Sequence, residues 1–175
     1  MTSTVSEKNP ACGGSRRNLG FWCLDVAPAL FYMAIIFSLG TDRASAGETH
    51  TLLERILGFL APGLLRSWGY EELEIANNIF RKLCHFGGYG LLGFLYARIA
   101  HTLRAGVWRP GDVYRIWLCA AVWAAVDEYH QSFSPSRGGS AYDVALDSAG
   151  AGAVILLFIW STHRWQTQRN LSNQI

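Results

Sequence analysis

The sequence predicts an all-α, polytopic integral membrane protein: a four-transmembrane-helix bundle with an interfacial amphipathic helix in its first outer loop. Half of the 175 residues are hydrophobic and 16% are charged, against roughly 25% charged in ordinary soluble domains. Seven Trp and 18 Gly indicate the same class, because both residues are frequent in and around membrane helices. Four apolar segments approach the roughly 20 residues that a helix needs to cross a bilayer.

The four segments lie at about residues 21–39, 83–100, 113–129 and 143–160, within one membrane domain at 21–160. Residues 1–20 and 161–175 are predicted as tails, and within them Met1–Arg17 and Gln166–Ile175 as disordered. The first segment also resembles a signal peptide, because "ASA" at residues 44–46 matches a small-residue cleavage pattern. Cleavage there would remove more than the usual length of roughly 15–30 residues, so retention as a membrane helix is favoured.

The connection after the first segment is not uniformly loop-like. The apolar residues of "LLERILGFLAPGLLRSW", at 52–68, lie on one side of a helix. This pattern predicts a helix in the plane of the membrane interface that ends at Pro62 and Gly63. The next stretch, "EELEIANNIFRKL", predicts a second helix that leads directly into the second span.

Basic residues predict the orientation. They are concentrated in the N-terminal tail, around the connection between the second and third segments, and in the C-terminal tail: Lys8, Arg16, Arg17, Arg98, Arg104, Arg109, Arg115, Arg164 and Arg169. These three regions share one side of the membrane if the helices alternate, and the positive-inside rule places that side in the cytoplasm. Both termini are therefore predicted to be cytoplasmic, and the stretch from Asp127 to Asp147 is predicted to face outward.

Charge and cysteine content argue against nucleic-acid binding, a cysteine metal site and a disulfide. A net charge of +2 without a basic run argues against nucleic acid as a partner. The cysteines form no C-x-x-C pair, and three of them lie in apolar stretches: Cys23, Cys84 and Cys119. Buried, reduced thiols are therefore expected rather than a metal site or a disulfide.

Polar residues gather at the outer ends of three predicted helices. They recur at helical spacing, so those of each helix lie near one face. A turn built around Pro135 and Gly138–Gly139 brings one further cation back over the bundle. The candidate polar site consists of Lys82, His85, Tyr89, Asp127, Glu128, Gln131, Arg137, Asp143 and Asp147.

Asp147 is the strongest member of this site. It lies about one helical turn inside the fourth segment, where an unpaired carboxylate is energetically costly. Lys82 and Arg137 are the expected partners of this carboxylate, with His85 as a titratable third. Other members also have ordinary explanations, as interfacial charges or, for Asp143, as an acid that satisfies a helix dipole. Asp25 and the histidines other than His85 are predicted to have no role in the site.

Two segments of the sequence carry a resemblance to a known family. "RKLCHFGGYGLLGFL" resembles the K-x-x-H-F-x-x-Y-x-x-L-G segment of the VanZ-like family, small bacterial membrane proteins named after a teicoplanin-resistance protein. "DEYHQSFSPSRGGSAYDVALDSAGA" resembles that family's D-E-x-x-Q-x-F-x-P-x-R-x-x-x-x-D-x-x-x-D-x-x-G segment. "IIFSLGTD" is similar to the family's Ser-rich exit from the first helix, although Gly40 replaces the usual second Ser. The resemblance covers about residues 35–152.

The resemblance implies a multi-pass protein of the bacterial cytoplasmic (inner) membrane that acts at the cell envelope. The favoured hypothesis is that the outward polar site engages a lipid-linked or peptidoglycan-associated molecule and influences susceptibility to glycopeptides such as teicoplanin. Membrane lipids are then the expected partners, and no cofactor is expected. The oligomeric state stays open.

Two other hypotheses remain open. One is a hydrolase or transferase at the outer leaflet, with a carboxylate as base and Lys82, His85 and Arg137 holding an anionic group. No nucleophile elbow, H-E-x-x-H or P-loop fixes a reaction class, so enzymatic activity is undecided. The other is a scaffold in which a buried ion-pair network joins the helices. A metal site is less favoured, because Lys and Arg already match the carboxylates.

Overall fold

The structure is a computed structural model that describes residues 19–40, 46–134 and 138–172, and these residues form helices and loops without a strand. The elements are η1 (Trp22–Val26), α2 (Ala27–Leu39), α3 (Ala46–Leu60), α4 (Pro62–Ser67), α5 (Tyr70–Leu103), α6 (Asp112–Gln131) and α7 (Ala141–Ser172). Residues 22–26 form one π-helical turn that continues directly into α2. The prediction of an all-α fold is confirmed for the described residues.

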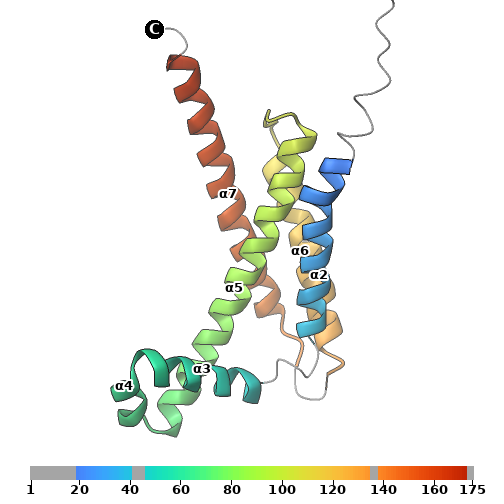
Figure 1. Cartoon of the computed structure of the whole chain (residues 1–175). Helices are drawn as coiled ribbons and strands as arrows, with labels where there is room; N and C mark the ends of the chain where they lie inside the picture. Colours follow the sequence, from blue (N-terminus) through green and yellow to red (C-terminus); the bar gives the residue numbers. More distant parts are fainter. Residues whose placement is uncertain (1–18, 41–45, 135–137, 173–175) are drawn as a thin grey trace, which may run out of the picture.

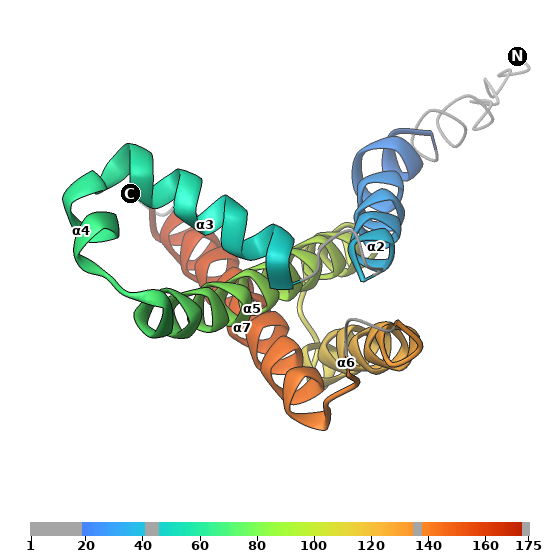
Figure 2. The ribbon, with the colours of Figure 1, turned by 90° about the horizontal axis from the view of Figure 1, so that it is seen from below.

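Helices α2, α5, α6 and α7 alternate in direction (Figure 1). The connection between α5 and α6 lies at one end of this arrangement. Helices α3 and α4 and the connection between α6 and α7 lie at the other end, which we call the loop end. Seen from that end, α3 and α4 lie across the bundle rather than along it (Figure 2). The alternation agrees with the predicted sharing of one side by the N-terminal region, the α5–α6 connection and the C-terminal region.

The predicted helices of the first loop are present. The chain leaves α3 at Leu60 and restarts at Pro62 as the short helix α4, because proline suits the first turn of a helix and not its interior. Helix α5 then runs without interruption from Tyr70 to Leu103. The prediction that a second helix leads directly into the segment at 83–100 is confirmed.

Two helical stretches, Leu19–Leu39 and Ala141–Gln168, are long and apolar enough to cross a membrane. The segments predicted at 83–100 and 113–129 are helical but do not pass the same test of length and composition. Glycine, histidine and tyrosine lower the hydropathy of α5, and charged residues interrupt the apolar run of α6 near both ends. Two spans are thus supported, and the four-span bundle remains a prediction.

Small residues bring α5 and α7 into close contact. A Cβ atom added to Gly93 would lie 2.7 Å from the backbone oxygen of Ala151, and one added to Gly150 would overlap the backbone oxygen of Phe86. Such contacts between small residues let two helix backbones approach each other in a membrane, where van der Waals packing drives association. Gly90 and Gly93 of α5, together with Gly150 of α7, therefore set how α5 crosses α7.

The buried apolar residues form two groups. One lies toward the α5–α6 connection and contains Ala97, Ile116, Ala120, Ala151 and Ile155. The other, which contains Tyr89, Leu92 and Ala124, is nearer the loop end. The outer faces of the helices carry exposed apolar side chains such as Phe31, Leu118 and Leu157, as faces that meet lipid do.

Helix α7 is longer than predicted. It continues to Ser172 rather than ending at Trp160, so the prediction of disorder from Gln166 is wrong for residues up to Ser172. The indole N–H of Trp108 donates to Thr162 Oγ1 at 2.9 Å, and the Gln166 amide donates to the Gly106 backbone oxygen at 2.8 Å. The α5–α6 connection therefore holds the helix beyond its apolar part.

The prediction of buried thiols is also wrong. Cys23, Cys84 and Cys119 are free, but all three are exposed. Cys84 lines a cavity beside α2, whereas Cys23 and Cys119 line neither of the cavities described below. Cys12 lies outside the described residues.

Candidate functional site

Three helices bring the predicted polar residues to the loop end of the bundle. Lys82, His85 and Tyr89 come from α5; Asp127, Glu128 and Gln131 come from α6; Asp143 and Asp147 come from α7. We call these eight residues the polar cluster. The ninth predicted member, Arg137, lies outside the described residues. Helical spacing positions most of each set, since the residues of each helix are separated by roughly whole turns, except that Glu128 directly follows Asp127.

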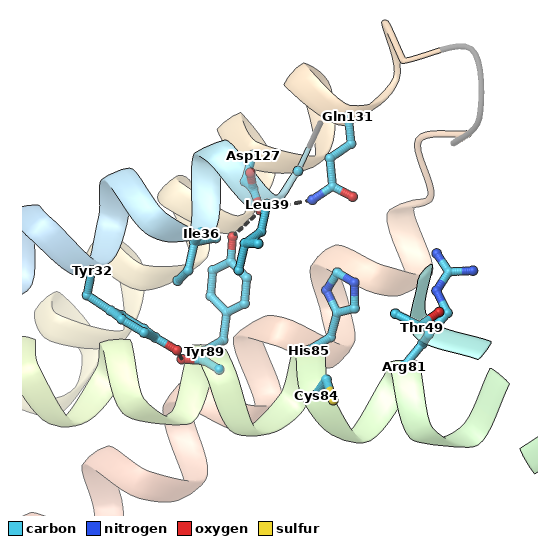
Figure 3. A pocket seen from close by; sticks show the side chains of 12 residues that line it. Tyr32, Ile36, Leu39, Thr49, Arg81, Cys84, His85, Tyr89, Asp127 and Gln131 are labelled. Carbon is cyan, nitrogen blue, oxygen red and sulfur yellow. Dashed lines mark hydrogen bonds between the residues drawn. The ribbon is translucent and has the colours of Figure 1, made fainter. Parts of the chain in front are cut away.

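Asp127 is held by two hydrogen bonds at the centre of the polar cluster. The Tyr89 hydroxyl and the Gln131 amide each donate to its Oδ2 at 2.9 Å (Figure 3). The Asp127 side chain is 1% exposed and Tyr89 is 2% exposed. The other carboxylate oxygen, Oδ1, is buried without a hydrogen-bond partner among the described residues. A Cβ atom on Gly40 would lie 3.1 Å from it, so glycine at position 40 leaves room for this carboxylate.

Asp147 is equally buried, and His85 faces it. The His85 Nδ1 atom lies 3.4 Å from Asp147 Oδ1, a distance that is long for a hydrogen bond and suits an ion pair when the imidazole is protonated. The His85 side chain is 22% exposed and the Asp147 side chain 1%. The imidazole thus links a buried carboxylate to a partly open space.

The predicted pairing of Lys82 with Asp147 is wrong in this structure. The Lys82 ammonium lies 4.2 Å from the centre of the Tyr142 ring, and it has no ion pair with Asp147. Lys82 precedes His85 by almost one turn of α5, so it lies nearer the end of the bundle. There its long stem places the ammonium over an aromatic face while the charge stays exposed.

Glu128 joins α6 to the start of α7. Its Oε1 accepts a hydrogen bond from the Ser140 backbone N–H at 2.6 Å, and its side chain is buried. Ser140 directly precedes α7, so the Glu128 carboxylate accepts a hydrogen bond from a backbone donor at the start of this helix. Its negative charge also interacts favourably with the dipole of α7. Glu128 therefore positions α7 relative to α6.

Two cavities open beside the polar cluster. The apolar cavity, of about 170 Å³, lies between α2, α5 and α6, and its walls include Tyr32, Ile36, Tyr89 and Asp127 (Figure 3). The polar cavity, of about 270 Å³, lies between α5 and the start of α7 and is lined by Asn78, Arg81, Lys82, His85, Ser140, Tyr142 and Asp143. Arg81 and His85 line both cavities.

Sequence reasoning missed several residues of these cavities. Arg81 precedes His85 by four residues, which is a same-face spacing that the sequence already contained. Its guanidinium forms no ion pair with any described carboxylate. No spacing in the sequence relates Tyr32 to the polar cluster, because Tyr32 belongs to α2 and meets α5 only in the folded structure. There its hydroxyl donates to the Gly88 backbone oxygen at 3.1 Å.

The opposite end of the bundle has ion pairs of its own. Arg98 Nη2 lies 2.8 Å from Asp25 Oδ1. Asp25 is buried and this contact joins η1 to α5, so Asp25 is an ion-pair partner at this end and, as predicted, lies outside the polar cluster. Asp112, at the start of α6, accepts from the backbone N–H of Arg109 and pairs with two arginines. These contacts hold its pKa below the usual value, with the backbone hydrogen bond as the largest cause.

No group of three or more His, Cys, Asp and Glu side chains within residues 19–40, 46–134 and 138–172 is arranged to hold a metal ion. What the site offers is a carboxylate–imidazole pair, a hydrogen-bonded buried carboxylate and cations beside two cavities. Such an arrangement suits the binding of a charged group next to an apolar one.

The all-helical fold and its two membrane-length helices indicate the class of helical membrane proteins. The profile of the VanZ/LLP1 family matches residues 26–162, and the chain belongs to this family. The match covers both segments that carry the resemblance in the sequence, so the predicted family is confirmed. Neither a curated protein nor a solved structure matches the chain.

Proposed function

We propose that this VanZ-like protein acts at the bacterial cell envelope, where its polar cluster faces outward and engages a lipid-linked or peptidoglycan-associated molecule. Binding of that molecule would influence the susceptibility of the cell to teicoplanin and related glycopeptides. The observation that carries the proposal is the placement of two almost fully buried carboxylates, Asp127 and Asp147, beside cavities that share Arg81 and His85.

Energetics support a ligand site over a pure scaffold. Buried ion pairs add little to stability, and apolar residues of similar volume often replace them without loss. Here Arg81, His85 and Asp127 also line open cavities, and Arg81 has no ion pair among the described residues. A group of charges with that arrangement is better explained by a ligand than by helix packing.

The distribution of charge supports the orientation. The arginines of the α5–α6 connection lie at the end opposite the polar cluster, and α7 carries Arg164 near its C-terminal end. By the positive-inside rule that end is cytoplasmic. Both termini are then in the cytoplasm, the protein is multi-pass, and both cavities lie at the outer leaflet of the cytoplasmic membrane.

The test is the teicoplanin susceptibility of cells that carry Asp147→Asn, measured beside the abundance of the protein in the membrane. Asparagine is nearly isosteric with aspartate but removes the charge that faces His85. We expect normal abundance and loss of the effect on susceptibility, and the same for Arg137→Ala on the predicted turn. Glu71→Gln, at an exposed position outside both cavities, is the matched control and should behave as wild type.

Two results would contradict the proposal. Wild-type susceptibility at normal abundance in both variants would leave the polar cluster without a role in the phenotype. Loss of abundance in both variants, with Glu71→Gln unaffected, would favour the scaffold.

A second candidate is an outer-leaflet hydrolase or transferase, which the His85–Asp147 pair favours. A carboxylate beside Nδ1 fixes the tautomer of an imidazole, and such an imidazole serves as a general base or acid. The purified protein would then release phosphate from a phosphorylated lipid, and His85→Gln would abolish the release. Equal rates in wild type and His85→Gln would exclude this role for the imidazole.

A further inference from the structure

We propose that the ligand is an anionic membrane lipid whose phosphate group binds to Arg81, Lys82 and His85 and whose chain enters the apolar cavity beside α2. This inference rests on the proposed function and names the chemical class of the molecule engaged there.

The cations that would bind the phosphate lie where the two cavities meet. Arg81 and His85 line both cavities, and Lys82 lines the polar one. Figure 3 shows His85 between Arg81 and Tyr89 along α5. A guanidinium donates two parallel hydrogen bonds to phosphate oxygens, and an ammonium adds a mobile point charge. With no carboxylate paired to it in the described chain, Arg81 has donors available for an anion.

The other side chains of the polar cavity suit a headgroup that carries hydroxyls. Asn78 and Ser140 each provide donors and acceptors there, and Asp143 provides a carboxylate. Arg81 and Lys82 together outweigh Asp143 in permanent charge, so one negative charge is favoured in this space. The Asp143 carboxylate would accept a hydrogen bond from a headgroup hydroxyl and would repel a second anionic group.

The apolar cavity explains why the phosphate would belong to a lipid. It continues from Arg81 and His85 past Gly88 to the α2 side chains Tyr32 and Ile36. At about 170 Å³ it holds only the part of a chain nearest the headgroup, and the remainder would lie in the bilayer.

The expected depth of the site in the membrane matches the level of the lipid headgroups. Thr49 of α3 lines the apolar cavity, and α3 is the amphipathic helix that lies across the loop end (Figure 2). Amphipathic helices of this kind sit at the boundary between headgroups and acyl chains. The junction of the two cavities is therefore at the level where a lipid phosphate is found.

The first test measures binding of phosphatidylglycerol to the purified full-length protein in detergent, by native mass spectrometry and by the rise in its unfolding temperature. We expect binding to wild type and an affinity lower by about tenfold in Arg81→Gln, because one charge-assisted contact is lost. Arg66→Gln removes the same charge from an exposed position of α4 that lines neither cavity, and its affinity should equal that of wild type. Arg81→Lys keeps the charge but loses the two parallel hydrogen bonds, so its affinity should lie between those of wild type and Arg81→Gln.

Two further ligands separate the sources of the phosphate. Phosphatidylcholine carries the phosphate without net negative charge and should bind more weakly than phosphatidylglycerol. Inorganic phosphate lacks a chain and should produce little stabilisation. Equal binding of both lipids, a full effect from inorganic phosphate, or equal losses in Arg81→Gln and Arg66→Gln would each overturn the proposal.

A matched pair of glycines tests whether the acyl chain of the lipid occupies the apolar cavity. Gly88 lines the apolar cavity, and a Cβ atom there meets the Tyr32 hydroxyl at 3.4 Å, whereas a Cβ atom on the adjacent Gly87 meets nothing within 4 Å. Both substitutions to leucine change helix propensity equally. We expect Gly88→Leu to weaken phosphatidylglycerol binding and Gly87→Leu to leave it unchanged. Equal effects would contradict a chain in this cavity. The pair also decides the matter if Arg81→Gln fails to fold.

The experiments distinguish failure of the lipid proposal from failure of the proposed envelope role. If wild type does not bind phosphatidylglycerol but Asp147→Asn still loses its effect on teicoplanin susceptibility, the lipid assignment is wrong and the envelope role stands. If the lipid binds as expected but Asp147→Asn behaves as wild type in cells, the envelope role is wrong and the lipid site stands.

Discussion

Asp127 illustrates how single residues hold the site together. One of its carboxylate oxygens accepts hydrogen bonds from Tyr89 and Gln131, and the other lies in the space that Gly40 leaves open. Each donor comes from a position fixed by a helix, so the carboxylate has little freedom to turn. This rigidity keeps a buried charge-bearing group at the wall of the apolar cavity, where an unsatisfied polar group is costly.

The Tyr89 hydroxyl should therefore contribute to stability. We expect Tyr89→Phe to lower the free energy of unfolding by about 1–3 kcal/mol, because it leaves a buried acceptor with one donor fewer. Tyr129→Phe removes a hydroxyl from an exposed tyrosine of the same helix bundle and serves as the control. Denaturant unfolding in detergent measures both variants, and an equal, small effect in the two would contradict the role given to the Tyr89–Asp127 bond.

Much of the polar cluster is predictable from the sequence, and some of its pairings are not. Helical spacing alone places His85 and Tyr89 on one face and predicts that α5, α6 and α7 present their polar residues at one end. The spacing does not say how far a flexible side chain reaches, so it predicts Asp147 as the partner of Lys82, whereas the ammonium lies over the Tyr142 ring. Arg81 shares the face of His85 at a spacing of four residues, but that spacing does not show that its side chain lines the same cavities, which follows only from the fold.

At the scale of elements, the contact between α5 and α7 determines the geometry of the site. The close approach at Gly93 and Gly150 sets the crossing of the two helices, and His85 and Asp147 lie on the same two helices. A change in that crossing would alter the Nδ1–Oδ1 separation of this pair. Glycine at these positions is therefore required for backbone contact rather than for a turn.

Gly93→Ala should reveal this requirement. The added Cβ atom would lie 2.7 Å from a backbone oxygen of α7, and we expect a loss of about 1–3 kcal/mol in stability, typical of an overpacked contact. Gly87→Ala has open space around the new atom and should be neutral or stabilising by up to about 1 kcal/mol, from helix propensity. Thermal unfolding of the two variants decides the matter. A stabilising Gly93→Ala would mean that the helices are not in close contact there.

Element boundaries show where the sequence is less informative. The continuous α5 and the amphipathic helix α3 follow from apolar periodicity, which the sequence displays directly. The end of α7 does not, because polar residues after Trp160 give no periodic signal. That part of the helix is held by Trp108 and Gln166 through contacts with the α5–α6 connection, which depend on the fold.

At the scale of the whole molecule, the alternation of four helices separates two different ends (Figure 1). One end has its carboxylates paired with arginines, as at Asp25 and Asp112. The other end has buried carboxylates, two cavities and a cation without an ion pair in the described chain. This asymmetry is the physical basis for assigning scaffold contacts to the first end and a ligand to the second. The sequence predicted the two ends from its basic residues. The apolar cavity depends on how α2 packs and the polar cavity on how α7 starts beside α5, and no local pattern records either.

The account depends most directly on the polar cluster facing outward, and cysteine labelling from the outside of intact cells tests this. In a variant whose native cysteines are replaced, Gly138→Cys places the probe in the α6–α7 connection and Val107→Cys places it in the α5–α6 connection, at a side chain that is 64% exposed. The neighbouring Gly106 is unsuitable as a labelling position, because its φ of +84° would strain a cysteine. The account predicts that a membrane-impermeant thiol reagent modifies Gly138→Cys and leaves Val107→Cys unmodified until the membrane is opened. The reverse pattern would place the polar cluster in the cytoplasm and contradict a role at the outer leaflet.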